Sequence, residues 1–256
     1  MDQRRNIFIT GATTGIGLAL AEAYLKEGHH VGMCGRDISK VPNNFKDIYP
    51  FMHLYQADVT NKEEIQAAIL DFCQGDIDLI IANAGIKENR FTSMPDFDIS
   101  RKVINTNLIG VINTFDIGVQ LMVPRKKGHL VAIASVAGFI GLPRAAAYSA
   151  SKAAVLKYLE AISFDLLKFG VNVTAIAPGF IDTPLTRDNN FNMPFLMDAR
   201  TGAKKIKNAI RKKKRLYIFP FRMFCVIYIL EKMPRFFYFF IMKIINSRLK
   251  DDEATS

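Results

Sequence analysis

Near the start of the chain lies the stretch Ile7-Phe-Ile-Thr-Gly-Ala-Thr-Thr-Gly-Ile-Gly17, which joins a short apolar strand to an amphipathic helix. Its glycines, Gly11, Gly15 and Gly17, can adopt positive φ and let the backbone approach a ligand closely. The N-terminus of the helix adds unpaired N–H groups and a dipole that favours an anion. The stretch therefore predicts a dinucleotide-binding site, although glycine-rich turns between a strand and a helix also occur for packing reasons alone.

Short apolar runs alternate with longer helix-like segments along most of the chain. The predicted strands are residues 7–10, 31–34, 51–55, 77–82, 128–134 and 171–177, with 216–219 as a last strand, and the predicted helices cover about residues 15–27, 61–73, 97–124 and 148–169. Parallel neighbouring strands need such crossovers, which are almost always right-handed. We therefore predict an α/β fold with a doubly wound, Rossmann-type parallel sheet of about seven strands, followed by an apolar helical C-terminal extension.

A length of 256 residues suits one such domain. We expect residues 1–219 to form it, with a substrate loop at about 184–200, and residues 220–256 to form the extension. The net charge of +10 is concentrated in one stretch without acidic residues, the basic cluster, which comprises Lys204, Lys205, Lys207, Arg211, Lys212, Lys213, Lys214 and Arg215. Because no aromatic platform or reading motif accompanies this cluster, we do not expect a nucleic-acid binder.

The cysteines and histidines have neither the spacing of a metal site nor that of a disulfide framework. The three cysteines are far apart and without CxxC spacing, which favours a reducing compartment. The four histidines are scattered and have no carboxylate or thiol at ligand spacing, so we expect no bound metal. The N-terminal residues lack the apolar segment of a signal peptide. We therefore expect a cytoplasmic protein.

The second predicted strand ends in Cys34-Gly35-Arg36-Asp37. An acid near this point binds the ribose hydroxyls in sites that prefer NAD, whereas a nearby arginine can pair with the 2′-phosphate of NADP. Gly35 stands where that acid is expected, and Arg36 follows it. This pattern favours NADP(H), although Asp37 could accept from the ribose instead, and both charged residues could simply form a solvated turn.

Tyr148 and Lys152 lie four residues apart at the start of a predicted helix, so their side chains share one face of it. The ordinary pKa of a tyrosine hydroxyl is about 10, and a neighbouring ammonium favours the phenolate and lowers that pKa. Such a pair is common on surface helices. Here, however, the apolar strand that ends at Ser135 precedes it, at the sheet edge where ligands of α/β proteins bind. The three side chains together predict an acid/base site.

These motifs resemble those of the short-chain dehydrogenase/reductase family, over roughly residues 5–185 and in the family's order. The resemblance implies four catalytic residues, Asn107, Ser135, Tyr148 and Lys152. Asn105 is a weaker match, since Asn107 directly precedes Leu-Ile-Gly. The cofactor-binding residues that it implies are Gly11, Thr13, Thr14, Gly15, Ile16, Gly17, Arg36, Asp58, Val59, Asn83, Ala84, Gly85, Tyr148, Lys152, Pro178, Gly179, Ile181 and Thr183.

The resemblance also implies the reaction. A hydride from NADPH would reach a carbonyl carbon while Tyr148 protonates the oxygen, and the reverse oxidation would use the same groups. Ser135 would orient that oxygen, Lys152 would lower the Tyr148 pKa and hold the nicotinamide ribose, and Asn107 would anchor a water that relays protons. Family members commonly form homodimers or homotetramers, which we expect here too. The alternatives are an NAD-dependent alcohol dehydrogenase of this family and a non-catalytic NADP-binding module.

The C-terminal extension departs from the family pattern. Its apolar stretches, 219–230 and 236–242, are shorter than the ~20 residues that a spanning helix needs. Together with the basic cluster they suit an interfacial anchor on an anionic membrane, at its cytoplasmic face. Alternatively, the extension covers the substrate cleft or forms a subunit interface, and the lysines are a solvated helix face.

An apolar extension also favours a lipophilic substrate, such as a ketone or keto-lipid. The predicted substrate loop points the same way, since its apolar residues are Pro184, Leu185, Phe191, Met193, Phe195, Leu196 and Met197. The same residues would equally suit a loop packed on the core.

Overall fold

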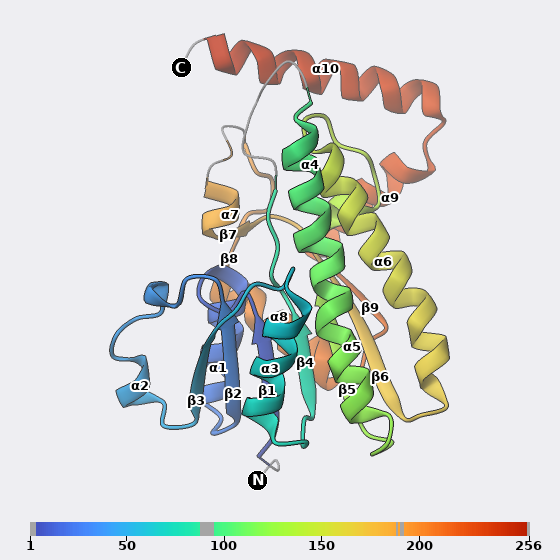
Figure 1. Cartoon of the computed structure of the whole chain (residues 1–256). Coiled ribbons are helices and arrows are strands. Elements are labelled where there is room, and N and C mark those ends of the chain that lie inside the picture. The colour runs from blue at the N-terminus through green and yellow to red at the C-terminus, as the bar shows by residue number, and fades with distance from the viewer. Residues whose placement is uncertain (1–3, 88–94, 188, 190–191, 255–256) are drawn as a thin grey trace.

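The computed structural model describes residues 4–87, 95–187, 189 and 192–254. A parallel sheet forms its centre, with seven strands in the order β3-β2-β1-β4-β5-β6-β9 (Figure 1). These strands are β1 (Asn6–Thr10), β2 (His30–Gly35), β3 (Met52–Gln56), β4 (Leu79–Ala82), β5 (Gly128–Ile133), β6 (Val171–Pro178) and β9 (Leu216–Phe219). The order reverses between β1 and β4, so the doubly wound fold predicted from the sequence is confirmed.

Helices cover both faces of the sheet. One face packs against α3 (Lys62–Cys73), α5 (Gly110–Met122) and α6 (Ala146–Leu167), and the other against α1 (Gly15–Leu25) and α8 (Ala199–Arg211). The shorter elements are α2 (Phe45–Ile48), α4 (Phe97–Ile104), α7 (Pro184–Arg187) and the strand pair β7 (Ile181–Asp182) and β8 (Met197–Asp198).

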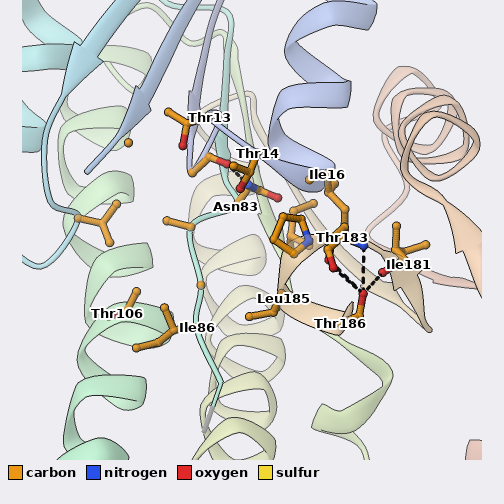
Figure 2. Close-up of a pocket in the computed structure, with 18 of the residues that line it drawn as sticks. Thr13, Thr14, Ile16, Asn83, Ile86, Thr106, Ile181, Thr183, Leu185 and Thr186 are labelled. Atoms are coloured by element: carbon orange, nitrogen blue, oxygen red, sulfur yellow. Dashed lines mark hydrogen bonds between the residues drawn. The ribbon is translucent and has the colours of Figure 1, made fainter. Parts of the chain in front are cut away.

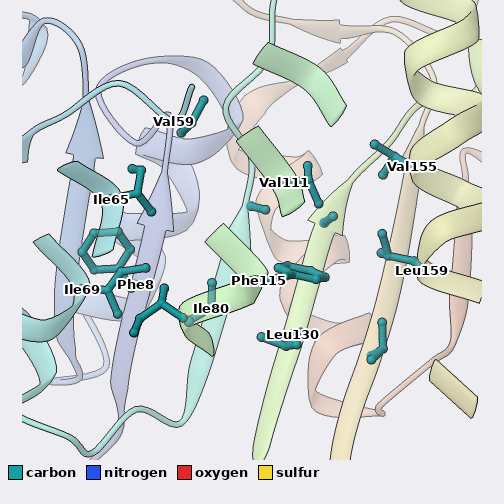
Figure 3. Close-up of a cluster of buried hydrophobic side chains, with 14 of the residues drawn as sticks. Phe8, Val59, Ile65, Ile69, Ile80, Val111, Phe115, Leu130, Val155 and Leu159 are labelled. Carbon is teal, nitrogen blue, oxygen red and sulfur yellow. The ribbon is translucent and has the colours of Figure 1, made fainter. Parts of the chain in front are cut away.

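The strands are apolar throughout because both of their faces are buried. Along β1, Phe8 points to the side of α3 and α5, where it joins Ile80 and Leu130 of neighbouring strands (Figure 3). Ile7 and Ile9 point to the opposite side and join the cluster beneath α1 and α8. Because successive strand side chains point to opposite faces of the sheet, one continuous apolar run contributes to two hydrophobic cores, one on each face.

The predicted helix at 97–124 is three pieces in the structure. A turn of π-helix, Asn105–Ile109, separates α4 from α5. The apolar pattern continues through the turn, so the sequence gives no sign of it. Such turns insert one residue into a helix and are frequent at functional sites.

The predicted substrate loop contains two short elements, α7 and β8. The parallel pairing of β8 with β7 ties its end to the segment after β6. Helix α8 begins directly after β8, with the Asp198 side chain accepting from the backbone N–H of Thr201 as its cap. Phe191, one of the apolar residues of the predicted loop, lies outside the described residues.

Two helices follow the last strand, α9 (Phe221–Lys232) and α10 (Arg235–Ala254). They pack on the loop after β5 through an apolar cluster that comprises Val136, Ile140, Met223, Ile227, Tyr238 and Met242. The Tyr238 hydroxyl donates a hydrogen bond to the carbonyl oxygen of Gly141. In Figure 1, α10 crosses the end of the molecule beyond the carboxyl edge of the sheet. Over the part of the chain that is described, no helix combines the length and apolarity needed to cross a membrane.

The basic cluster lies apart from these apolar helices. Its first half belongs to α8, where Lys207 pairs with Glu27 and donates to the carbonyl oxygen of Ala23. Arg211 and Lys213 lie at the amino edge of the sheet, around a hollow that Arg4 and Gly128 also line. Strand β9 then carries the chain toward the carboxyl edge, where α9 and α10 begin. Arg211 and Lys213 therefore lie near the other edge of the sheet from the cluster formed by α9 and α10.

Candidate active site

A cavity of about 570 Å³ opens at the carboxyl edge of the sheet, where the strand order reverses between β1 and β4. Ligands of doubly wound proteins bind at this position, and the volume lies within the range of ligand pockets. All of the predicted cofactor-binding residues except Gly17 line the cavity, and so does Ser135. Figure 2 shows side chains from several separate segments of the chain around it.

The glycine loop has the backbone that its sequence predicted. Gly11 and Gly15 have φ of +62° and +56°. Gly17 lies behind the cavity wall, where a Cβ would come 2.2 Å from the carbonyl oxygen of Gly11 and 2.5 Å from Nδ2 of Asn83. The Asn83 amide donates to that same oxygen at 2.9 Å, which joins the loop to the end of β4. Thr14, which precedes α1, makes no side-chain cap, so the first N–H groups of the helix can bind an anion.

Two cations line the cavity at the end of β2. They are Arg36 and Lys40. A Cβ at Gly35 would lie 2.7 Å from a methyl group of Thr13, so a larger side chain there would require Thr13 to move. The Asp37 carboxylate accepts from the Ser39 hydroxyl at 2.6 Å and pairs with Lys40 at 3.4 Å. The Ser39 and Lys40 contacts hold the pKa of the Asp37 carboxyl below its usual value.

Asp58 and Val59 line the next part of the wall, after β3. The Asp58 carboxylate accepts from both the backbone N–H and the hydroxyl of Thr60, each at 2.9 Å. The side chain thus stabilises its own turn. Val59 is buried against Gly110, where a Cβ would come 2.6 Å from the valine. This contact brings the turn close to the start of α5.

Ser135 follows β5 and caps a short helical turn, Val136–Gly138, with its hydroxyl accepting from the N–H of Ala137 at 3.2 Å. The turn packs directly on the backbone of α6. A Cβ at Gly138 would come 2.7 Å from the carbonyl carbon of Lys152, so only glycine permits this approach. The close contact holds Ser135 beside the first turns of α6, which carry Tyr148 and Lys152.

Lys152 is buried, with its Nζ donating to the carbonyl oxygen of Ile133 at 2.8 Å and lying 5.7 Å from the centre of the Tyr148 ring. Burial lowers the pKa of its ammonium to about 8. A Cβ at Gly85 would lie 3.4 Å from this Nζ and 3.3 Å from Oδ1 of Asn107. The absence of a side chain at Gly85 therefore leaves Lys152 and Asn107 facing one space.

Asn107 lies in the π-helical turn and is fully buried. Its side chain binds the loop after β4, accepting from the N–H of Ile86 at 2.8 Å and donating to the Ile86 carbonyl oxygen at 2.9 Å. Its amide also donates to the Ser151 hydroxyl at 2.9 Å, and that hydroxyl donates to the carbonyl oxygen of Tyr148 at 2.8 Å. Asn107 thus joins the cavity wall to the helix that carries Tyr148.

The segment after β6 lies beside the glycine loop, where a Cβ at Gly15 would come 3.1 Å from the Thr183 side chain. Pro178, Gly179, Ile181 and Thr183 all line the cavity. Thr186 holds this segment together, because its hydroxyl accepts from the N–H of Thr183 at 3.0 Å and donates to the carbonyl oxygen of Ile181 at 2.5 Å (Figure 2).

Sequence reasoning missed several residues of the wall, among them Lys40, Ile86, Thr106, Leu185 and Thr186. Lys40 could have been predicted, because it is a second cation four residues after Arg36. Leu185 was predicted only as an apolar residue of the substrate loop. The polar residues Thr106 and Thr186 carry no distinctive pattern. No group of metal-binding side chains occurs within the described ranges.

Comparisons with known proteins agree on one family. The family model described as "short chain dehydrogenase" matches residues 5–193. An "Uncharacterized oxidoreductase" of Myxococcus xanthus is 34% identical over 224 residues, which cover 86% of this chain and 88% of the relative.

Two solved structures are similar in fold. A short chain dehydrogenase from Burkholderia cenocepacia in complex with NADP has a TM-score of 0.80 at 24% identity, covering 96% of this chain and 98% of its own. A short chain dehydrogenase/reductase from Burkholderia phymatum in complex with NAD has a TM-score of 0.82 at 20% identity, covering 90% and 94%. NADP carries a 2′-phosphate that NAD lacks.

Proposed function

The chain belongs to the short-chain dehydrogenase/reductase family of oxidoreductases, and we propose that it interconverts a carbonyl compound and a secondary alcohol with NADP(H). One observation carries this proposal. Ser135, Tyr148 and Lys152 meet at the wall of the same cavity that the glycine loop lines. The residues proposed to bind the cofactor and those proposed to transfer the proton therefore line one cavity.

The residues of the wall fit a dinucleotide. The positive φ of Gly11 and Gly15 and the uncapped N-terminus of α1 suit a pyrophosphate. When bound, reduced nicotinamide supplies a hydride to the carbonyl carbon. The segment from Pro178 to Thr183, which lines the same cavity, would hold the carboxamide of that ring.

The protein's own groups would handle the oxygen and its proton. The Tyr148 hydroxyl donates its proton to the developing alkoxide, and the Ser135 hydroxyl orients the same oxygen with a hydrogen bond. The Lys152 ammonium favours the tyrosinate left behind and binds the nicotinamide ribose. Asn107 positions the Tyr148 helix through Ser151, and a water held beside Asn107 and Lys152 would relay the next proton to Tyr148.

The end of β2 supports NADP(H) over NAD. Arg36 and Lys40 present two cations to the cavity, which suits the 2′-phosphate. The nearest acid, Asp37, accepts from Ser39 and pairs with Lys40, so its carboxylate is already used. An NAD site would need that carboxylate to turn toward the ribose.

We propose a lipophilic ketone or keto-lipid as the substrate. Ile86 and Leu185 line the cavity on the side of the substrate loop, and α9 and α10 add an apolar cluster beside the loop after Ser135.

We also propose a cytoplasmic homodimer or homotetramer, which sedimentation velocity would test.

The test is a comparison of the wild type and Tyr148→Phe with a panel of long-chain ketones, acyl thioesters, steroids and small aldehydes. The wild type should consume NADPH with at least one lipophilic member of the panel and prefer NADPH to NADH. Tyr148→Phe should reduce that rate by about 10²- to 10⁴-fold. Reduction at a comparable rate by the variant would contradict the assignment of Tyr148.

A further inference from the structure

Helix α10 is anchored by one face and leaves an aromatic face open. Tyr238 and Met242, one turn apart, are 5% and 7% exposed and pack on the loop after β5. On the opposite side, Phe236, Phe239 and Phe240 are between 60% and 72% exposed. Because residues three and four apart share a helix face, these three phenylalanines form one continuous surface.

This surface is larger than isolated exposed residues explain. Each phenylalanine carries about 150–250 Å² of area, so three of them expose a patch on the order of several hundred Å², a size at which exposed apolar patches are often functional. Phe221, at the start of α9, is 74% exposed and adds to the apolar character of these helices.

The stretch from 220 to 247, which carries the exposed phenylalanines, has four cations and one acid, and Asp251, Asp252 and Glu253 follow at the end of α10. Lys243 follows Phe239 by four residues and Phe240 by three, so it lies on the same face. Arg222, Lys232 and Arg235 are the remaining cations of residues 220–247, and Glu231 is the single acid of that stretch. Aromatic rings beside cations suit the boundary between anionic headgroups and acyl chains.

We infer that the outward face of α10 binds the surface of a membrane that contains anionic lipid. A second copy of the chain fits less well, because a two-fold contact brings the same patch against itself. A two-fold axis beside Lys243 would place this cation against its own counterpart. Anionic lipid instead supplies the opposite charge for Lys243 and an apolar layer for the phenylalanines.

The position of the membrane-binding helix has a consequence for catalysis, and this consequence rests on the proposed function. Helix α10 lies beyond the carboxyl edge of the sheet, the edge at which the cavity opens. Its inner face packs on the loop that follows Ser135. Membrane binding through α10 would therefore bring the cavity close to lipophilic carbonyl compounds dissolved in the bilayer.

The chain contains no tryptophan, so a single Phe240→Trp substitution in the full-length protein gives a specific fluorescent reporter. Phe164→Trp is the matched control, since Phe164 is 61% exposed on α6 and Phe240 is 60% exposed on α10. On addition of vesicles of phosphatidylcholine and phosphatidylserine, the Phe240→Trp emission should shift to shorter wavelength and be quenched by brominated acyl chains. The control should not change.

Charge and aromatic contacts are tested separately by co-sedimentation with the same vesicles. Lys243→Gln should weaken partitioning about fivefold, the effect of one cation near an anionic surface. The double variant Phe236→Ser/Phe240→Ser should abolish partitioning, whereas Phe164→Ser should retain it, and circular dichroism establishes that each is folded. None of these readouts needs catalysis, so a failure of the proposed enzyme activity would leave them interpretable.

Two results would overturn the inference. The first is a Phe240→Trp emission that the vesicles of phosphatidylcholine and phosphatidylserine leave unchanged. The second is an emission shift that depends on protein concentration without lipid, together with a doubled mass that Phe236→Ser/Phe240→Ser reduces to that of one chain. That result would assign the surface to self-association.

Discussion

Replacing Lys152 with methionine is expected to stabilise the folded protein while removing its proposed activity. The Lys152 side chain is 4% exposed, and burial lowers the pKa of its ammonium from 10.5 to about 8. Each pKa unit corresponds to about 1.4 kcal/mol, so at neutral pH the buried charge costs the folded state about 3 kcal/mol. The proposed reaction requires this charge beside Tyr148, because the ammonium favours the tyrosinate.

The net gain is smaller than this cost. Methionine has a similar length and fills the same space, but it leaves the carbonyl oxygen of Ile133 without its bond from Lys152. That loss costs about 1 kcal/mol. Lys152→Met should therefore raise the free energy of unfolding by about 2 kcal/mol at neutral pH.

The difference should depend on pH. Since the Lys152 pKa is lower in the folded state, the unfolded chain binds more protons between pH 8 and 10.5, and the wild type gains stability across that window. The advantage of the variant is therefore complete below about pH 8 and lost above about pH 10.5. Urea unfolding of both ligand-free proteins, at neutral pH and at about pH 10, measures it.

Lys157→Met provides the control on the same helix. The Lys157 side chain is 82% exposed and pairs with Glu160, so its replacement should change stability by less than about 1 kcal/mol. A Lys152→Met protein less stable than the wild type at neutral pH, or a difference that stays constant up to about pH 10, would refute the reasoning.

Three further predictions concern the cofactor site and the C-terminal helices. Arg36→Ala should weaken NADPH binding about ten- to a hundredfold and leave NADH binding nearly unchanged, as measured by calorimetric titration; equal losses for both would remove the assignment of Arg36 to the phosphate. Gly17→Ala should lower the free energy of unfolding by about 2 kcal/mol, because its Cβ would lie 2.2 Å from a backbone oxygen, and an unchanged thermal midpoint would contradict the packing described. Tyr238→Phe should cost about 1 kcal/mol through its lost bond to Gly141, whereas Tyr228→Phe, at an exposed position, should cost nothing measurable.

The sheet could be predicted from the sequence because buried parallel strands are continuous apolar runs. The stretch from Ile7 to Gly17 identifies the first strand, the turn and the helix, and the spacing of Tyr148 and Lys152 identifies one helix face. These are local patterns, in which neighbours along the chain are also neighbours in space. The structure adds that the elements carrying them meet at one cavity.

The remaining features depend on contacts between distant segments. Ser151 connects Asn107 to Tyr148 only because α6 lies against the π-helical turn, and nothing in its sequence context distinguishes it from an ordinary helix serine. Similarly, β9 carries the chain toward the carboxyl edge of the sheet, which separates Arg211 and Lys213 at the amino edge from Phe236 and its neighbours. Strand β9 makes this change of edge within only four residues, so the sequence does not reveal it.

The most direct test of the central claim is the transfer of deuterium from NADPH labelled at the reactive position of its nicotinamide ring to the best carbonyl substrate of the panel. We predict that the wild type places the label on the carbinol carbon of the product. Tyr148→Phe should still bind NADPH and form about 10²- to 10⁴-fold less labelled alcohol. An alcohol formed without the label, or formed by Tyr148→Phe at the wild-type rate, would contradict the account.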